Sequence, residues 1–347
     1  MDSRYSRQLL IPAFCDGQRR LARARVLVVG AGGLGCPVLL ALAGAGVGTS
    51  AAGGWIRIVD PDVVDISNLH RQFLYTEADC GDTKVEAAAR RLDLLNSDLA
   101  IDPHQRVFAN EHAASLLEGV DLVLDCTDNL ASRLDLNHWC YHLGLPLISA
   151  GISRYAGVLS CFNGQAPPCL ACASRFSNFG ADCAVDGIVG AVAQAFGSLM
   201  ANQALQYLLG NRFGMQGMWL LDSKHMQATS IRVPPDPGCV VCSTRRQAPT
   251  QAGLEVDWHE CKQNWLLVDI RERSDLDKDG IRHIPAALLR RDLYKELGDS
   301  KPAALVLLCN RGAQSLALAR QLLADYRPQQ MQIFSLRGGV KALLQRE

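Results

Sequence analysis

The stretch Val26–Gly35 constrains the fold more than any other part of the chain. Its first four residues are apolar and mostly β-branched, which predicts a buried strand. Gly30, Gly32 and Gly35 follow with the G-x-G-x-x-G spacing, and the apolar segment 36–45 predicts a helix. Such a turn lets the backbone approach a phosphate group and presents a helix N-terminus to it. The stretch therefore predicts a nucleotide-binding α/β fold, although the spacing alone does not identify the nucleotide.

Strand and helix patterns continue to alternate after this stretch. Further strands are predicted at 56–59, 105–108, 120–125 and 145–149, and helices at 83–96 and 130–143. This alternation predicts a Rossmann-like, doubly wound and mostly parallel sheet. Residues 4–23 predict a short helical arm before the first strand.

One long segment, from Gly187 to Gly210, contains no charged residue. At that length a membrane span is conceivable. However, Gln194, Asn202 and Gln203 interrupt the segment, and alanine and glycine dominate over leucine and isoleucine. We therefore expect a buried helix.

Charge and composition narrow the range of partners. Lys and Arg together number 35, as do Asp and Glu, so the formal net charge is zero. The chain therefore has no basic field that would attract nucleic acid or an anionic membrane, and we expect it to bind neither. The N-terminus lacks the apolar segment of a signal peptide, so we expect a cytoplasmic location.

Charged residues follow the predicted strands where an α/β sheet binds its ligand. Asp60 ends the second strand, where a carboxylate would bind ribose hydroxyls, or it is a plain turn residue. Lys84 lies in the first turn of a predicted helix, as a phosphate ligand or a solvated lysine. Asp128 follows the strand at 120–125, and it would hold Mg²⁺ or cap the next helix.

Thirteen cysteines without a secretory signal favour metal binding or thiol chemistry over disulfides. Two C-x-x-C pairs, Cys169–Cys172 and Cys239–Cys242, predict a structural zinc site with four thiolate ligands. The alternative is one redox pair and a coincidental second pair. Cys183, in a loop of small polar residues, is either a nucleophile or a buried apolar residue.

The cysteine pairs close the first predicted domain, residues 1–246. A linker is predicted at 247–254, and a smaller α/β domain at 255–347. In this second domain Cys309 follows an apolar strand and precedes a loop and a helix. Backbone N–H groups there would stabilise a thiolate, although a buried core cysteine is the simpler interpretation.

Residues 1–246 resemble the E1-like adenylating enzymes of the ThiF/MoeB/HesA type. The resemblance is carried by Arg4–Gln8, Gly30–Gly35, Asp60–Asp62, Ser67–Gln72, Lys84–Val85, Cys126–Asn129 and the two C-x-x-C pairs. Residues 255–347 resemble a rhodanese domain. This second resemblance is carried by Val268–Arg271, His283–Pro285, the Cys309 loop and Leu336–Val340. The fusion is similar to MoeZ/Uba4-like activators of sulfur carriers.

The resemblance implies ATP-dependent adenylation of a small ubiquitin-like sulfur carrier at its C-terminal Gly-Gly carboxylate. It implies that Asp60 binds the ribose of ATP, and that four glycines pass close to the phosphates: Gly30, Gly32, Gly33 and Gly35. Asn68, Arg71 and Lys84 would contact the triphosphate. Asp128 would hold Mg²⁺.

The family resemblance also implies a homodimer, in which Arg7 reaches into the partner's site. Zn²⁺ would be bound by Cys169, Cys172, Cys239 and Cys242. The catalytic roles would fall to Arg71, Asp128, Cys183 and Cys309.

Sulfur transfer is implied for the second domain. A cysteine desulfurase would leave a persulfide on Cys309, which would attack the acyl-adenylate, and Cys183 would form or resolve a covalent intermediate. The chain departs from the family at Gln314, where rhodanese loops usually carry arginine, and in the longer loop Gly48–Gly54. Arg311 would supply the missing charge.

The first domain looks closest to MoeB, so we expect a role in molybdopterin biosynthesis. Carriers for thiamine, a siderophore or tRNA thiolation remain open, as does a peptide substrate. A non-catalytic scaffold that binds a ubiquitin-like protein is another alternative. An NAD-dependent oxidoreductase would use the same glycine loop but leaves Arg71, Lys84, Asp128 and the cysteine pairs unexplained.

Overall fold

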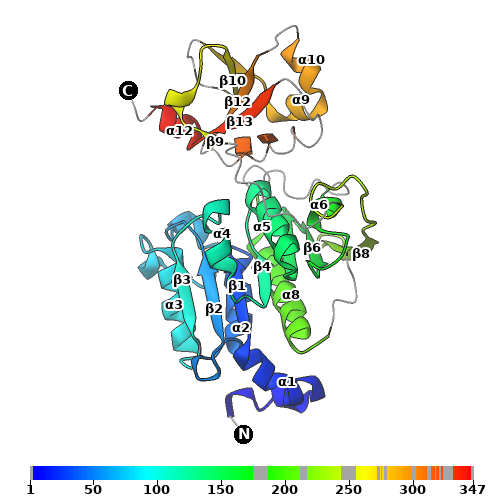
Figure 1. The fold of residues 1–347 in the computed structure, drawn as a ribbon. Helices are drawn as coiled ribbons and strands as arrows, with labels where there is room; N and C mark the ends of the chain where they lie inside the picture. The colour runs from blue at the N-terminus through cyan, green and yellow to red at the C-terminus, as the bar shows by residue number, and fades with distance from the viewer. Residues whose placement is uncertain are drawn as a thin grey trace. The chain divides into compact units, whose positions relative to one another are not determined.

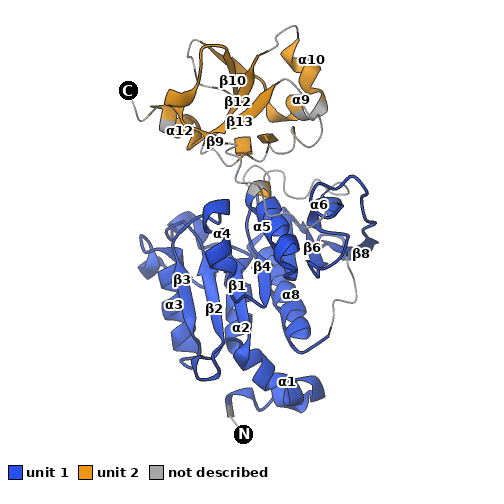
Figure 2. Cartoon of the chain, in the orientation of Figure 1, with its two compact units in different colours: residues 1–128, 132–249 blue, residues 129–131, 250–347 orange. Residues whose placement is uncertain are grey.

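The computed structural model describes most of the 347 residues. They are 3–174, 187–211, 217–243, 255–271, 274, 276, 280–298, 302–310, 314–316, 318–319, 322 and 331–344. The chain divides into two compact units, residues 1–128 with 132–249 and residues 129–131 with 250–347 (Figure 2). The predicted linker 247–254 lies outside the described residues.

Unit 1 is built on an eight-stranded sheet in the order β3-β2-β1-β4-β5-β6-β7-β8 (Figure 1). The strands are β1 Arg25–Val29, β2 Trp55–Val59, β3 Ile101–His104, β4 Leu122–Asp125, β5 Leu147–Ser153, β6 Ala156–Phe162, β7 Gly217–Asp222 and β8 Gln227–Arg232. The first five run parallel, and β6, β7 and β8 continue the sheet antiparallel. The strand order reverses between β1 and β4, which is where open α/β sheets bind ligands.

Helices cover both faces of this sheet. They are α1 Pro12–Arg23, α2 Gly35–Gly44, α3 Lys84–Leu95, α4 Asn110–Leu117, α5 Leu130–Leu143, α6 Leu170–Ala173 and α8 Gly190–Leu208. Short 3₁₀ turns are η1 Ser3–Tyr5, η2 Gln8–Leu10, η3 Ser50–Ala52, η4 Ile66–Asn68 and η5 Glu77–Asp79.

Successive side chains of β1 point to opposite faces of the sheet, so they belong to two separate layers of the core of unit 1. Val26 and Val28 share one core cluster with residues of α2 and α8, whereas Leu27 and Val29 share the other with Trp139 of α5. Both faces of the strand are therefore buried, as expected for a parallel strand between helical layers. The prediction of a doubly wound, mostly parallel sheet is confirmed.

The third strand was predicted in the wrong place. Residues 105–108 are irregular, and β3 lies just before them at Ile101–His104. The sequence pattern does not predict this strand, because it contains Asp102 and Pro103, and both residue types are depleted in strands. The sheet tolerates Pro103 because β3 is an edge strand.

The charge-free segment forms α8, which packs its apolar residues into the core of unit 1. No helix in the described part of the chain is long and apolar enough to span a membrane. The longer loop Gly48–Gly54 contains η3 and is held by backbone hydrogen bonds such as Gly48 N to Leu21 O, at 3.0 Å. Val59 still pairs with Val29, so the loop does not shift the end of β2.

Unit 2 contains a five-stranded parallel sheet in the order β11-β10-β12-β13-β9. Its strands are β9 Glu255–Val256, β10 Trp265–Asp269, β11 Ile281–His283, β12 Ala304–Leu308 and β13 Gln332–Leu336. Its helices include the 3₁₀ turn η6 Trp258–Glu260 and the α-helices α9 Ala286–Arg291, α10 Leu293–Leu297 and α12 Gly339–Leu344, and residues 314–316 are also helical. Leu305 and Leu307 of β12 face one core cluster and Val306 the other.

Two glycines of α2 provide a matched test of the tight turn after β1. A Cβ atom at Gly35 would lie 2.0 Å from the carbonyl oxygen of Gly30, whereas one at Gly44 would meet nothing within 4 Å. We expect Gly35→Ala to lower the free energy of unfolding by about 1–3 kcal/mol through overpacking. Gly44→Ala should raise it by about 0.5–1 kcal/mol, because alanine is the better helix former. Thermal or urea unfolding of the two full-length variants measures the difference, and equal stabilities would contradict this account.

Candidate nucleotide site and cysteine clusters

The glycine loop after β1 is held by the neighbouring strands. Gly30 has a φ of +95°, and a Cβ atom there would lie 2.6 Å from the carbonyl oxygen of Cys126. Both backbone polar groups of Ala31 are hydrogen-bonded. Its N–H donates to Asp60 Oδ2 at 2.7 Å, and its carbonyl accepts from Tyr75 Oη at 2.8 Å. The loop is therefore preorganised at the carboxyl ends of β1, β2 and β4.

A buried charge pair lies beside this loop. Asp60, at the end of β2, and Lys84, in the first turn of α3, are each only 5% exposed. Lys84 Nζ lies 4.0 Å from Asp60 Oδ1 and 2.9 Å from Asp62 Oδ2. Burial raises the pKa of Asp60, and the ammonium group of Lys84 opposes that rise. The sequence predicted both as ligands, and the structure brings them together.

Asn68, at the end of η4, holds two polar side chains that lie against the same loop. Asn68 Oδ1 accepts hydrogen bonds from Gln72 Nε2 at 2.9 Å and from Arg71 Nη2 at 3.3 Å. A Cβ atom at Gly33 would lie 3.6 Å from Arg71 Cγ, and one at Gly32 the same distance from Gln72 Nε2. A cation and an amide therefore line the glycine loop, and Asn68 holds both in place.

Gln72 supports the presence of a ligand here. It is 3% exposed, and its Oε1 has no hydrogen-bond partner among the described residues. A buried carbonyl oxygen without a partner is costly, and a bound molecule with a hydroxyl or amino group would satisfy it. The glycine backbone, the cations and this acceptor together fit a nucleotide. Gln72 is in the sequence motif but was not predicted as a ligand.

The loop after β4 carries Asp128, which is exposed. Asp125, at the end of that strand, is fully buried, and its carboxylate accepts from Thr127 Oγ1 at 2.6 Å and Ser149 Oγ at 2.5 Å. Arg133 Nε lies 3.1 Å from Asp125 Oδ2. These groups fix the backbone from which Asp128 projects. Sequence reasoning missed Asp125 and Arg133 as supporting residues, because a buried ion pair across a turn leaves no spacing signal.

Arg7 lies elsewhere in unit 1. It is exposed, and Gln8 beside it donates to the carbonyl of Ala45 at 3.1 Å, just beyond the C-terminal end of α2. The glycine loop lies at the other end of that helix, about 15 Å away along its axis at 1.5 Å per residue. Arg7 is therefore not brought to the glycine loop of its own chain.

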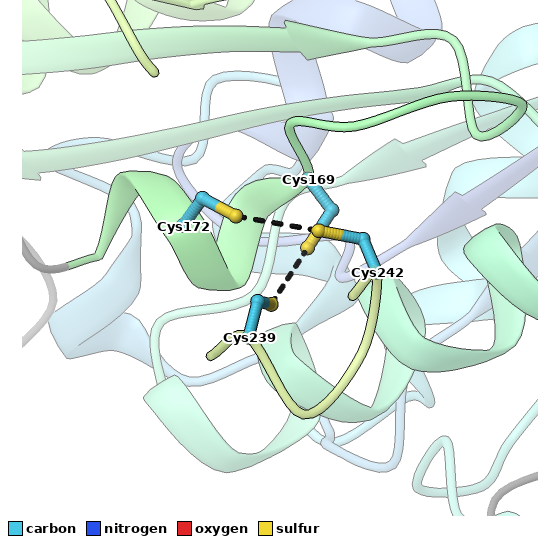
Figure 3. A group of neighbouring side chains, drawn as sticks. All are labelled: Cys169, Cys172, Cys239 and Cys242. Atoms are coloured by element: carbon cyan, nitrogen blue, oxygen red, sulfur yellow. Dashed lines mark hydrogen bonds between the residues drawn. The ribbon is translucent and has the colours of Figure 1, made fainter. Parts of the chain in front are cut away.

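The two C-x-x-C pairs meet in one cluster, although about seventy residues separate them (Figure 3). All four Sγ atoms are within 4.8 Å of one another. Cys169 Sγ lies 3.7 Å from Cys239 Sγ, and Cys172 Sγ lies 3.4 Å from Cys242 Sγ. Zn–S bonds of about 2.3 Å in a tetrahedron place sulfurs about 3.8 Å apart, so the cluster fits zinc.

The protonation behaviour of the cluster also fits a metal site. A hydrogen bond between Cys169 and Cys172 raises the pKa of Cys169 and lowers that of Cys172, and a second bond from Cys169 lowers the pKa of Cys239. Two of the four thiols, Cys172 and Cys239, therefore have a lowered pKa, whereas the pKa of Cys169 and that of Cys242 are raised. Cys36 and Cys126 lie by the glycine loop, but burial raises the pKa of both thiols, so they are inert.

In unit 2, Cys309 follows β12 and is 2% exposed. The N–H and Oγ of Ser315 donate to Cys309 Sγ at 3.4 and 3.3 Å, and the Ser315 hydroxyl is 2.9 Å from that of Ser335. These donors suit a sulfur anion. Ser315 was not predicted from the sequence. Gln314 is exposed in the helix that follows, and Arg311 and the rest of the 311–313 segment lie outside the described residues, as does Cys183.

An acidic residue supports the same end of the sheet in unit 2. Asp269, buried at the end of β10, is held by Arg271 Nη2 at 2.8 Å and Ser274 Oγ at 2.6 Å. Burial raises the pKa of Asp269, but these hydrogen bonds lower it by more, so the net pKa is lowered and the carboxylate stays ionised. Arg271 Nη1 also donates to Asn310 Oδ1 at 3.2 Å, which orders the residue after Cys309.

Comparison with known proteins identifies the first unit. The family model described as the ThiF family matches residues 5–241. The chain belongs to the ThiF family. The sequence-based identification of a ThiF-type domain is therefore confirmed.

Relatives in that family extend over most of the chain. An adenylyltransferase and sulfurtransferase MOCS3 from Culex quinquefasciatus is 33% identical across 92% of this chain and 82% of its own length. The MOCS3 protein of Anopheles gambiae is 38% identical across 74% of this chain, but that match spans only 58% of the relative. The molybdopterin-synthase adenylyltransferase of Escherichia coli K12 is 37% identical across 69% of this chain and 95% of its own length. These names support an enzyme that joins adenylyltransferase and sulfurtransferase domains.

Solved structures share the fold of the first unit. The structure of E. coli MccB with ATP superposes with a TM-score of 0.60 and 22% identity over 70% of this chain and 75% of that chain. At this level of identity the likeness shows the fold alone.

Zinc content tests the cysteine cluster. We expect about one zinc ion per purified chain, because four thiolates at these distances form a closed structural site. Cys239→Ala should lose the metal and unfold at a lower temperature. Cys161→Ala, which removes a buried thiol of β6 outside the cluster, should keep it. Elemental analysis with thermal unfolding measures both, and a zinc-free wild-type protein from zinc-replete cells would contradict the assignment.

Proposed function

We propose that this chain adenylates the C-terminal Gly-Gly carboxylate of a ubiquitin-like sulfur carrier and then converts it to a thiocarboxylate, in molybdopterin cofactor biosynthesis. The names of the MOCS3 relatives and of the E. coli adenylyltransferase support both activities and the pathway. The proposed domains are an adenylation domain at 1–246 and a rhodanese-like sulfurtransferase domain at 255–347. We place the chain in the cytoplasm, as its composition suggests.

The observation that carries the adenylation proposal is the position of Arg71 and Lys84 beside the glycine loop. Arg71 packs on Gly33, and Lys84 lies between Asp60 and Asp62. A dinucleotide needs the glycines and the carboxylate of Asp60 but not two cations at this point. A triphosphate does need them, because negative charge accumulates on its phosphates in the transition state.

In the first reaction, a carboxylate oxygen of the carrier attacks the α-phosphorus of ATP. A carbon–oxygen–phosphorus linkage forms, the bond from the α-phosphorus to the bridging oxygen breaks, and pyrophosphate leaves. Arg71 and Lys84 stabilise the charge on the leaving pyrophosphate, and Asp60 orients the ribose. Asp128 would hold Mg²⁺, which neutralises phosphate charge when bound. We propose that Arg7 of a second copy completes the site in a homodimer.

In the second reaction, the outer sulfur of a persulfide on Cys309 attacks the acyl carbon, and AMP leaves. The product is an acyl disulfide between the carrier and Cys309. A second thiol, which we propose is Cys183, then attacks Cys309 Sγ, releases the thiocarboxylate and leaves a disulfide for a cellular thiol to reduce. A cysteine desulfurase supplies the persulfide sulfur. This donor needs less cationic charge than thiosulfate does, which suits a chain with Gln314 in the loop.

Pyrophosphate exchange tests the first reaction. With a carrier that ends in Gly-Gly, wild-type protein should exchange labelled pyrophosphate into ATP, and Asp128→Asn should lower the rate at least about 100-fold by removing a charged ligand. Asp121→Asn is the matched control, since Asp121 precedes β4 and accepts from Arg25 N at 2.9 Å, at the strand's other end. Absence of exchange with molybdopterin, thiamine and other Gly-Gly carriers would contradict the proposal. Exchange only with a different carrier would reassign the pathway.

Mass spectrometry tests the second reaction. After incubation with a cysteine desulfurase and cysteine, the peptide that contains Cys309 should gain the mass of one sulfur atom. Cys309→Ala should abolish thiocarboxylate formation while leaving pyrophosphate exchange intact. Cys261→Ala removes the other cysteine of residues 255–347 and should leave both activities unchanged. Thiocarboxylate production by the Cys309 variant would disprove the relay but not the adenylation.

A further inference from the structure

One face of α5 carries three buried polar residues in a row. Arg133, Asn137 and Tyr141 are spaced four residues apart, and they are 6%, 2% and 7% exposed. Side chains at this spacing lie along one side of a helix, over about 12 Å at 1.5 Å per residue. We refer to these three residues as the α5 stripe.

The stripe contacts the nucleotide side of unit 1 at its N-terminal end. Arg133 Nη2 donates to the carbonyl of Thr127 at 2.7 Å and to that of Ala150 at 2.9 Å, and its Nε faces the carboxylate of Asp125. Thr127 directly precedes Asp128. The backbone position of Asp128 therefore depends on where Arg133 lies.

The other two residues of the stripe contact the cysteine cluster, one at each C-x-x-C pair. Asn137 Nδ2 donates to Cys169 Sγ at 3.6 Å, and its Oδ1 accepts from Leu170 N at 2.9 Å. Tyr141 Oη donates to the carbonyl of Cys242 at 3.3 Å. Asn137 thus touches a proposed zinc ligand and fixes the turn that presents it. Partners of this kind orient metal ligands and tune their affinity.

Buried polar groups cost stability unless each finds a partner, so an apolar stripe would be the simpler way to pack α5. Here Arg133 contacts Thr127 and Asp125 near one end of α5, whereas Asn137 and Tyr141 contact the cysteine cluster farther along the same helix. A shift of α5 that loosens Cys169 or Cys242 also moves Arg133 relative to Thr127.

We propose that the α5 stripe couples the zinc cluster to the adenylation site, with Asn137 and Tyr141 as positioning residues. Metal in the cluster would hold α5 in the position at which Arg133 binds the carbonyl of Thr127 and so fixes the Asp128 loop. This inference rests on the proposed adenylation function and adds an energetic link between two sites that share no ligand. Because such coupling is reciprocal, bound nucleotide must also raise the affinity of the cluster for zinc, and we expect the tighter binding to appear as slower zinc release.

The test measures zinc release from the full-length, zinc-loaded protein. Excess 4-(2-pyridylazo)resorcinol reports release, with and without saturating Mg²⁺ and α,β-methylene-ATP. The protection ratio is the release rate without nucleotide divided by the rate with it. We expect a ratio of about 5 or more in the wild-type protein, the lower end of typical coupling between sites.

Variants on α5 distinguish coupling through the α5 stripe from a general stabilisation of the fold by bound nucleotide. Asn137→Asp keeps an acceptor for Leu170 N but loses the donor to Cys169, and Tyr141→Phe removes only the hydroxyl. We expect both to release zinc about tenfold faster without nucleotide, and to bring the protection ratio close to one. Trp139→Phe is the matched control, because Trp139 lies on α5 but donates to Asn110 Oδ1 at 2.8 Å. It should keep the wild-type ratio.

Each outcome decides one question. An equal ratio in all four proteins would show that nucleotide protects zinc only by stabilising the whole fold, and would overturn the coupling. A wild-type ratio of one with nucleotide bound would overturn it as well. If Asn137→Asp does not fold, Tyr141→Phe alone carries the comparison with Trp139→Phe. Failure of the wild-type protein to bind the nucleotide, measured by calorimetry, would instead refute the proposed adenylation function.

Discussion

The close approach of two backbones at the switch point of the sheet is the constraint on which unit 1 depends. Gly30 leaves β1 with a positive φ and packs against the carbonyl of Cys126, which leaves β4. No side chain fits between them. This contact lets the glycine loop and the Asp128 loop share one site, because it holds the ends of adjacent strands together. Asp60, which follows β2, and Arg71 then place charged side chains beside the glycine loop, whose backbone can approach a ligand closely.

Both units use the same device at the ends of their parallel strands. Asp60 directly follows β2, and Asp125 and Asp269 are the last residues of β4 and β10. Each carboxylate accepts a hydrogen bond from the N–H group two residues later, at 2.9–3.1 Å. Each is buried and faces a cation: Lys84, Arg133 and Arg271 respectively. A buried carboxylate is costly unless it is paired, and the pair fixes the turn that follows the strand. In each case that turn leads to a residue with a proposed chemical role, or contacts the segment that carries one.

The predictable part of the site consisted of residues that lie near one another in sequence. Glycine spacing, Asp60 at a strand end and the paired cysteines each follow from local geometry, and the helix predicted at 130–143 after a capping residue coincides with α5. The misplaced third strand shows the limit of that reasoning, since Pro103 is acceptable only at a sheet edge, which composition does not reveal. Asp125, Arg133, Asn137 and Tyr141 were missed for the same reason. Asp125 ends a strand and pairs with Arg133 of α5 and Ser149 of β5, and the three residues of α5 bond to segments far from their own helix. Nothing in the local sequence pattern reveals these contacts.

By itself, the sequence determined the class of fold, the nucleotide loop and the four candidate metal ligands, because turns, periodicity and short-range spacing are properties of the chain itself. Tertiary structure alone decided which groups meet. It brought Lys84 to Asp60 and Arg71 to Gly33, it left Arg7 at the far end of α2, and it connected the cysteine cluster to the Asp128 loop through one helix. These contacts arise only when helices bury their apolar faces on the sheet, since burial forces each polar group on those faces to find a partner from a distant segment.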